Sequence, residues 1–160
     1  MRSGALRVCD VNLRQSFYNA ELLHGSLGRA HIVKLNSDEL CEVSFLLGLG
    51  AGDEALLAKK LMSLFNLRIV CITRGANGSL LMSEDETIEH RGFRVKVSDA
   101  VGSGDAFTAC LAHCYLRGKS LKQISESANR IASWVASQVG ATPVIPRGTL
   151  EEIFGAVVPE

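Results

Sequence analysis

The order of hydrophobic and polar positions along the chain predicts short strands that alternate with helices. The clearest strand is Leu67 to Thr73, because its continuous apolar and β-branched run is typical of a buried parallel strand. The clearest helix begins after Ser120 and reaches about Val139, with apolar positions spaced near every 3.6 residues. Strands are expected at 6–13, 31–35, 67–73, 78–82 and 87–97, and helices at 20–27, 38–47, 54–65, 105–117 and 120–139, with a short one after Thr149.

This alternation predicts a parallel sheet with helices on both faces. We therefore expect an α/β fold, a three-layer α/β/α doubly wound sheet that is mostly parallel. No repeat, low-complexity tract or linker interrupts the pattern, so a single domain over 1–160 is predicted. Ser120 with Gln123, and Thr149 with Glu152, have the spacing of capping boxes at the starts of the last two helices.

A glycine-rich turn, Gly102-Ser103-Gly104-Asp105, joins the last predicted strand to a helix. Small residues at such a turn let backbone N–H groups approach an anion, and the helix start adds unpaired donors. A P-loop is excluded because Asp105 stands where lysine is required, and the dinucleotide fingerprint is excluded by Phe107. A carboxylate beside phosphate donors is what phosphoryl transfer to a hydroxyl requires; the alternative is that Asp105 is a plain helix N-cap.

Polar residues also follow the other predicted strands. Because ligands of such sheets bind beyond the carboxyl ends of the strands, these clusters are expected to meet at one edge. Asp10, Asn12 and Arg14 are expected on one face of the first strand, where a strand-end salt bridge is the alternative reading. The remaining clusters are 36–39, 73–78 and 99–105.

Charge and cysteine content narrow the classes of function. Seventeen basic residues balance seventeen acidic ones, so no overall field favours nucleic acid or an anionic membrane as a partner. No apolar run approaches the roughly 20 residues that span a bilayer, and the start lacks a signal-peptide core, so a cytoplasmic protein is expected. The five cysteines are expected to be free thiols; Cys110, Cys114 and His113 leave a metal site as the lesser alternative.

The segment 99–107 resembles the C-terminal signature of the ribokinase-like carbohydrate kinases, also called phosphofructokinase B-type kinases. The motifs at 10–14, 36–39, 73–78 and 128–130 occur in the order found in that family. The resemblance implies transfer of the γ-phosphoryl group of ATP to a hydroxyl of a small sugar, with Mg²⁺ and a monovalent cation such as K⁺. The motif at 10–14 favours a fructokinase-like or keto-sugar-acid kinase.

The resemblance also implies roles for single residues. Asp105 aligns with the catalytic base, and Gly102, Ser103 and Gly104 align with the anion hole. Nucleotide-binding positions by the same resemblance are Thr73, Arg74, Gly75, Gly78 and Asn129. For 73–78 the alternative is a plain turn into a hairpin, and for Asn129 it is a helix-surface residue.

Three further sets of positions take roles from the resemblance. Asp10, Asn12 and Arg14 are expected to serve the substrate and phosphate, with Arg14 contacting the acceptor or a phosphate and Asn12 ordering that region. Asn36 and Glu39 are expected to hold Mg²⁺ through water, although their spacing is also that of a capping box. Asp99 is expected to ligate the monovalent cation, although Ala100 stands where the family often has threonine.

The resemblance covers only the C-terminal, nucleotide-binding portion of the family. The N-terminal half, with its Gly-Gly signature and lid, is expected to be missing from these 160 residues. Without it the acceptor is poorly oriented, so weak or no activity is expected of the chain alone, and an unpaired sheet edge favours a homodimer. Two alternatives stay open: a non-catalytic ATP-binding remnant, and a nucleoside kinase of the same fold.

Overall fold

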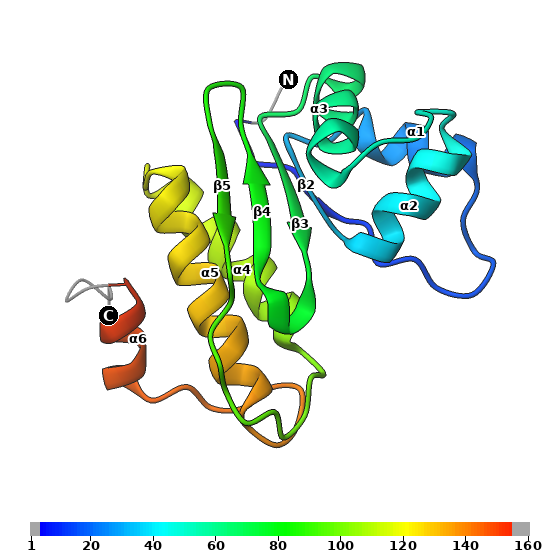
Figure 1. The fold of residues 1–160 in the computed structure, drawn as a ribbon. Helices are drawn as coiled ribbons and strands as arrows, with labels where there is room; N and C mark the ends of the chain where they lie inside the picture. Colours follow the sequence, from blue (N-terminus) through cyan, green and yellow to red (C-terminus); the bar gives the residue numbers. More distant parts are fainter. Residues whose placement is uncertain (1–3, 155–160) are drawn as a thin grey trace. The chain divides into compact units, whose positions relative to one another are not determined.

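The computed structural model describes residues 4–154, which divide into two compact units between Glu89 and His90 (Figure 1). The first unit holds a sheet and three helices, and the second is built around a helix pair. The first contains β1 (Val8–Asp10), α1 (Ala20–Leu27), β2 (Ile32–Asn36), α2 (Ser37–Leu46), α3 (Glu54–Phe65), β3 (Ile69–Thr73), the 3₁₀ turn η1 (Gly75–Asn77), β4 (Ser79–Met82) and β5 (Thr87–His90), which ends at the boundary. The second contains α4 (Ser103–Leu116), α5 (Leu121–Ala136) and α6 (Arg147–Phe154).

The five strands form one sheet in the order β1-β2-β3-β4-β5. β1, β2 and β3 run parallel, whereas β4 pairs antiparallel with β3. The α/β class with a mostly parallel sheet is thus confirmed. The antiparallel pairing of β4 agrees with a sheet predicted to be mostly parallel. Only the short turn 74–78 joins β4 to β3, and a parallel crossover needs a dozen or more residues. That both units form a single domain stays a prediction.

The core of the first unit lies between the sheet and its helices. Val33 and Leu35 of β2 and Val70 and Ile72 of β3 are fully buried and pack in one cluster with α1, α2 and α3, which cover this face (Figure 1). The alternate residues of the same strands are buried as well, Cys71 among them. Burial on both faces explains why these strands have continuous apolar runs instead of an alternating pattern.

The second unit is held together by α4 packing on α5. Phe107 and Leu111 of α4 and Ile124, Ala128 and Ile131 of α5 are all buried. The helical periodicity of α5 is therefore confirmed. None of the described helices is both long and apolar enough to span a bilayer.

The ends of two predicted elements differ from expectation. The capping box at Ser120 and Gln123 is present, but Thr149 does not cap α6, which already begins at Arg147 after Pro146. The predicted strand 87–97 stops at His90. Beyond it the apolar and polar residues still alternate, but Val97 is 56% exposed, so the alternation buries no face within the described residues.

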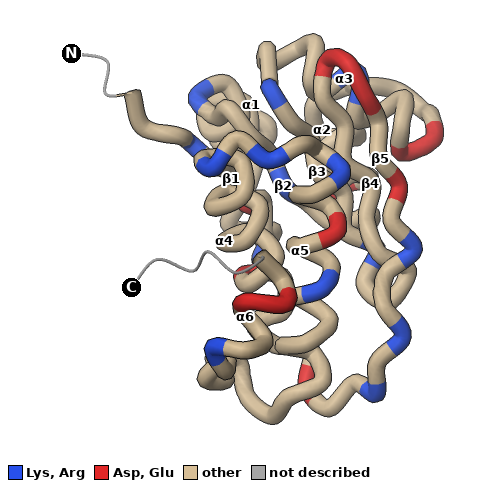
Figure 2. The backbone as a smooth tube through the Cα atoms, turned by 90° about the vertical axis from the view of Figure 1, so that its left-hand side faces the viewer, with Lys and Arg blue, Asp and Glu red and all other residues tan. Residues whose placement is uncertain are grey.

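Charged side chains are dispersed over both units, and Figure 2 shows basic positions along the segment that follows β5. Arg91, Arg94 and Lys96 of this segment are exposed. They are local exceptions in a chain whose net charge is zero.

Leu35→Ala is expected to lower the free energy of unfolding by about 2–5 kcal/mol, because it opens a cavity in the core beneath β2. Leu35 is 0% exposed, whereas Phe45, on α2 of the same unit, is 81% exposed. Phe45→Ala is the matched control and should stay within about 0.5 kcal/mol of the parent. Urea unfolding followed by circular dichroism gives both values; equal losses would contradict this placement of the core.

Candidate functional site

At the carboxyl end of β1, a buried lysine holds the first predicted site residue. Lys34 of β2 lies opposite Asp10 in the parallel register, and its Nζ is 3.0 Å from both carboxylate oxygens. Lys34 is only 8% exposed, so the pair is largely shielded from water. This is the strand-end salt bridge that was the alternative reading of Asp10. Sequence reasoning missed Lys34, although a lone lysine in an apolar strand signals such a pairing.

Asn12 and Arg14 do not continue the face of the strand that carries Asp10. β1 ends at Asp10, and Asn12 has a φ of +38°, in the left-handed region that ends an extended strand. The prediction of three residues on one strand face is therefore wrong. Asn12 and Arg14 lie instead in an exposed loop. The loop leaves the Arg14 side chain accessible to an anionic ligand.

Glu39 braces this loop against the next strand. One carboxylate oxygen accepts the N–H of Leu13 at 3.1 Å, and the other accepts the N–H of Asn36 at 2.7 Å. The side chain of Asn36 accepts the N–H of Glu39 at 2.8 Å, which completes the capping box of α2. The capping reading of Asn-x-x-Glu is confirmed. Through it, one carboxylate joins the loop after β1 to the end of β2.

This geometry bears on whether Asn36 and Glu39 suit Mg²⁺. Both Glu39 oxygens already accept backbone N–H groups, and the described residues contain no group of three or more His, Cys, Asp or Glu side chains that could hold a metal ion. A direct metal ligand set is thus absent from this part of the chain. Carboxylate and amide oxygens can still accept hydrogen bonds from the waters that Mg²⁺ retains, so the residues fit an ion held through water.

A polar pocket of about 410 Å³ opens beside the ends of β2 and β3. Asn36 and Thr73 are register partners on its floor, and Gly75 and Asn77 of the turn η1 line it. Gly75 and Gly78 have φ values of +57° and +83°, which favour glycine. The predicted turn into a hairpin is present, and its loop also borders a pocket.

Arg74 lies in this pocket with its guanidinium already paired. Its Nε donates to Glu54 at 2.6 Å, and its Nη2 donates to Glu89 at 3.1 Å. Burial alone would lower the pKa of Arg74, but the hydrogen bonds and charges of Glu54 and Glu89 raise it. Ser37 donates to the second oxygen of Glu54 at 2.6 Å. Sequence reasoning missed Ser37 and Glu54, because a contact seventeen residues apart in the chain leaves no local pattern.

In the second unit, the glycine turn leads into α4 as expected. Gly102 is the N-cap with a φ of +82°, and Asp105 is the third residue of the helix, so the reading of Asp105 as an N-cap is wrong. A Cβ at Gly102 would overlap the backbone carbonyl of Ala141. Only glycine fits this position, because both the φ and the contact exclude a side chain.

The start of α4 presents unpaired backbone donors. The N–H of Ser103 donates to the carbonyl of Ala100 at 3.3 Å, and no side chain caps the helix. Over residues 4–154, the N–H groups of Gly102, Gly104 and Asp105 have no hydrogen-bond acceptor. The Asp105 side chain is exposed. Together with the positive end of the helix dipole, these donors suit a phosphate, so the turn fits an anionic ligand.

Asp99 forms hydrogen bonds that hold the glycine turn in place. One oxygen accepts the N–H of Val101 at 2.9 Å, and the other accepts the N–H of Gly140 at 3.3 Å. Its own N–H donates to the carbonyl of Ala136 at the end of α5. Asp99 therefore ties the turn to the segment after α5. A monovalent cation at this carboxylate stays a prediction.

Asn129 lies inside the helix pair. It is 4% exposed, and its side-chain nitrogen donates to the carbonyl of Ser125 at 2.7 Å. The alternative of a helix-surface residue is wrong. The predicted contact with a nucleotide has no exposed amide to act through in this arrangement.

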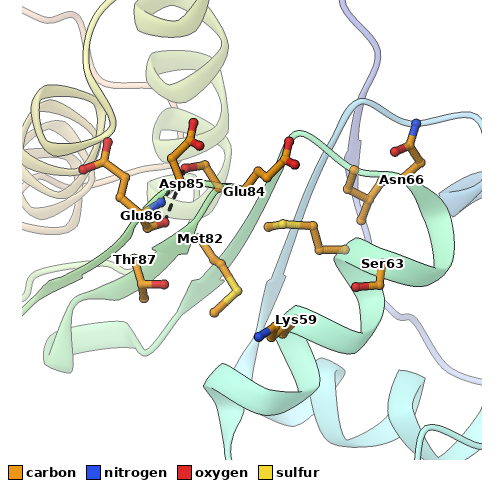
Figure 3. A pocket seen from close by; sticks show the side chains of 11 residues that line it. Lys59, Ser63, Asn66, Met82, Glu84, Asp85, Glu86 and Thr87 are labelled. Atoms are coloured by element: carbon orange, nitrogen blue, oxygen red, sulfur yellow. Dashed lines mark hydrogen bonds between the residues drawn. The ribbon is translucent and has the colours of Figure 1, made fainter.

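A second pocket of the first unit, about 430 Å³, contains none of the predicted site residues (Figure 3). It lies between α3 and the turn from β4 to β5, with the acidic run Glu84-Asp85-Glu86 on its rim. Leu67 lines it, so it lies near the amino end of β3, away from the polar loops that follow β1, β2 and β3. Its position argues against a part in the predicted site.

Comparison with known proteins places these features in a family. The sequence profile of the pfkB family carbohydrate kinases matches residues 2–147. Aminoimidazole riboside kinase of Salmonella typhimurium is 30% identical over 90% of this chain, and probable fructokinase-2 of Arabidopsis thaliana is 27% identical over 90%. Each alignment covers 46% of the relative, so the chain spans about half the length of these curated proteins.

Solved structures give the same result for the fold. Ribokinase of Thermotoga maritima superposes with a TM-score of 0.79 at 22% identity, over 95% of this chain and 50% of that one. Aminoimidazole riboside kinase of Salmonella enterica, complexed with aminoimidazole riboside and an ATP analog, gives a TM-score of 0.75 at 28% identity over 91% and 51%. The fold is ribokinase-like.

Gly102→Ala is expected to lower the free energy of unfolding of the second unit by more than the cost of placing alanine at a positive φ. Gly118 is the matched control, because its φ is +67° and a Cβ there meets nothing within 4 Å. Gly118→Ala should cost about 1 kcal/mol from the backbone conformation alone. At Gly102 the carbonyl of Ala141 must also move, so a larger loss is expected in urea unfolding. Equal losses at the two glycines would contradict the close contact.

Glu39→Gln is expected to loosen the loop after β1. The amide replaces one acceptor oxygen with an NH₂ group that opposes a backbone N–H, which leaves one backbone donor without its acceptor. Amide exchange at Leu13 or Asn36 should become faster. Glu42→Gln, on the same helix, is the control, since Glu42 has no hydrogen-bond partner among the described residues. Unchanged exchange at both amides in Glu39→Gln would contradict the brace.

Proposed function

This chain belongs to the pfkB family of carbohydrate kinases, and from that premise we propose that it carries the phosphoryl-transfer part of an ATP-dependent kinase. The acceptor is a hydroxyl of a small sugar. The observation that supports this most is the start of α4, where three backbone N–H groups without acceptors lie beside the exposed carboxylate of Asp105. Anion donors and a base within one turn of helix are the minimum that phosphoryl transfer to a hydroxyl needs.

Asp105 is proposed as the base. As the third residue of α4 it is fixed by the helix, while its side chain faces solvent and can reach an incoming hydroxyl. The proton of the acceptor hydroxyl passes to a carboxylate oxygen of Asp105 as the new O–P bond forms and the bond between the γ-phosphorus of ATP and its bridging oxygen breaks, so that ADP leaves. The N–H groups of Gly102 and Gly104 stabilise the negative charge that builds on the phosphoryl oxygens.

Bound Mg·ATP supplies the phosphoryl group and neutralises part of its charge. Asn36 and Glu39 are proposed to accept hydrogen bonds from metal-bound water, and Arg14 to bind an anionic oxygen from its exposed loop. Thr73, Gly75 and Gly78 are proposed to contact the nucleotide. Arg74 is proposed to orient this loop, because two of its five N–H donors are held by Glu54 and Glu89. Its remaining donors are proposed to bind a phosphate oxygen of the nucleotide.

Support for the cofactor comes from relatives of the same fold. A putative ribokinase II of E. coli was solved in complex with ATP and Mg²⁺, and phosphofructokinase-2 of Escherichia coli was solved with potassium. K⁺ near Asp99 is the corresponding proposal here. Both likenesses are at or below 20% identity and show the fold alone, so the cofactors come to this chain as proposals.

The acceptor is the least determined part of the proposal. The motif at 10–14 favours a fructokinase-like or keto-sugar-acid kinase, and the Arabidopsis relative is named a probable fructokinase. The aminoimidazole riboside kinase match favours a nucleoside as the second candidate. A non-catalytic ATP-binding role is the third, because the chain spans about half of these relatives. A cytoplasmic location and a homodimer are proposed with the kinase.

Mg·ATP is expected to raise the midpoint of thermal unfolding of the purified chain. A ligand that binds only the native state adds about 2.7 kcal/mol of stability at a hundredfold excess over Kd. ATP without Mg²⁺ and Mg²⁺ without ATP are the controls. A cooperative transition that Mg·ATP leaves unmoved would contradict nucleotide binding by this chain.

Asp105→Asn is expected to abolish most phosphoryl transfer and to leave the Mg·ATP stabilisation intact. Loss of a general base lowers kcat by roughly 10²–10⁴-fold, while the backbone donors remain. The assay measures ADP release with each member of a panel of sugars and nucleosides. The substitutions are made in a polypeptide that contains this chain and releases ADP in that assay. Asp85→Asn in the β4–β5 turn is the matched control. Equal rates for Asp105→Asn and the parent would contradict the assignment of the base.

A further inference from the structure

Two cysteines of α4 lie side by side and take no part in the proposed reaction. The Sγ atoms of Cys110 and Cys114 are 3.9 Å apart, one helical turn from each other, and both residues are 2% exposed. Both are free thiols. His113, the third residue of the metal alternative, packs its ring against Phe154 at 5.2 Å between centroids. The cluster is therefore a dithiol, with no third metal ligand among the described residues.

A small molecule can reach this pair through a pocket. Cys114 lines a pocket of about 520 Å³ in the second unit, between the end of α4, the start of α5 and α6. Ile153 and Phe154 provide apolar lining, and the charged residues that line the pocket are Lys119, Lys122 and Glu126. The thiol is thus shielded from bulk water but borders a space large enough for a small reagent.

The surroundings of Cys114 favour its thiolate. The thiol of Cys110 donates to it, and with Ser127 and the positive charge of Lys119 this outweighs burial and lowers the pKa of Cys114 to about 7. The pKa of Cys110 is raised by the same hydrogen bond and by burial. A thiolate that accepts a thiol hydrogen bond is the arrangement of an attacking and a resolving cysteine.

Two of the other three cysteines, Cys71 and Cys41, differ from this pair in burial and in thiol neighbours. Cys71 of β3 is fully buried, borders no pocket described here, and burial raises the pKa of its thiol. Cys41 of α2 is exposed and has no thiol neighbour. Cys71 is therefore an internal control for a buried thiol, and Cys41 is one for an exposed thiol.

We propose that Cys110 and Cys114 form a redox site that small hydroperoxides oxidise to a disulfide and thiols reduce again. The Cys114 thiolate attacks the terminal peroxide oxygen, the O–O bond breaks, and Cys114 becomes a sulfenic acid. The alkoxide or hydroxide that leaves takes a proton from solvent to give an alcohol or water. The Cys110 sulfur then attacks the sulfenic sulfur, water leaves with the thiol proton, and the S–S bond forms. The peroxide is reduced by two electrons and the dithiol is oxidised by two.

The position of the pair on one helix makes the oxidised form labile. Residues four apart on a helix have Cβ atoms about 5–6 Å apart, whereas a disulfide needs roughly 3.5–4.5 Å. α4 must therefore bend or tighten when the bond forms. A disulfide under such strain is readily reduced, which suits a reversible modification and not a structural cross-link.

The test treats the purified chain with equimolar hydrogen peroxide at neutral pH, followed by alkylation, trypsin and mass spectrometry. The tryptic peptide 97–117 contains Cys110 and Cys114 and no other cysteine, so loss of two hydrogens from it identifies their disulfide. We expect this loss, its reversal by dithiothreitol, and no oxidation of Cys71. Without peroxide, alkylation of Cys114 by iodoacetamide should rise with pH through an inflection near 7.

Two variants separate the steps. Cys110→Ser keeps a hydroxyl that can donate to Cys114 but has no sulfur, so the reaction should stop at the sulfenic acid, which dimedone traps on Cys114. Cys114→Ala should leave Cys110 unoxidised, because burial still raises the pKa of Cys110 and keeps it as a thiol. Cys71→Ala is the matched control and should oxidise like the parent. The proposal is overturned if the peptide keeps both thiols while Cys41 is oxidised, or if the only disulfides formed join Cys41 residues of separate molecules. None of these outcomes depends on the proposed kinase activity.

Discussion

The proposed chemistry depends on one close contact, between the Cα of Gly102 and the backbone carbonyl of Ala141. No side chain fits there, and the positive φ that glycine allows turns the chain directly into α4 without a capping side chain. Among the described residues, the N–H groups of Gly102, Gly104 and Asp105 at the start of α4 stay without acceptors as a result. In water such donors bind solvent; beside a phosphate they neutralise charge with no reorganisation of the protein. Asp99 fixes the turn because one of its oxygens accepts the N–H of Val101 and the other accepts the N–H of Gly140.

In the first unit, side chains instead of a glycine turn fix the segments that follow the strands. Its loops follow the carboxyl ends of parallel strands, where backbone groups have no ladder partners. Glu39 accepts one N–H in the loop after β1 and one at the end of β2, and Lys34 and Glu54 hold Asp10 and Arg74 in ion pairs. Asp10, Glu39 and Arg74, which the family resemblance assigns to ligand binding, are therefore already bonded to other groups of the protein. Exposed Arg14 and the pocket beside Thr73 remain open to a ligand.

Local patterns predicted most of the elements, because helix periodicity and apolar strands are signals carried by neighbouring residues. α1 and α3 have the predicted bounds, and the capping boxes at Asn36 and Ser120 are present. The failures share a cause. Two predictions assumed that an alternating sequence pattern remains a strand to its end: the strand at 91–97, and the shared strand face of Asp10, Asn12 and Arg14. The length of a strand depends instead on whether a neighbouring strand pairs with it. Lys34, Glu54 and the thiol pocket depend on contacts distant in sequence, which no local pattern contains.

The most direct test of the account is a titration of the ¹⁵N-labelled chain with Mg·ATP, followed by NMR at backbone amides. The account predicts that the resonances of Gly104 and Asp105 shift together and saturate, since their N–H groups gain a phosphate acceptor. Gly118, at the other end of α4, should stay unmoved. Saturable binding in which Gly104 and Asp105 do not shift would contradict the claim that the start of α4 receives the phosphate.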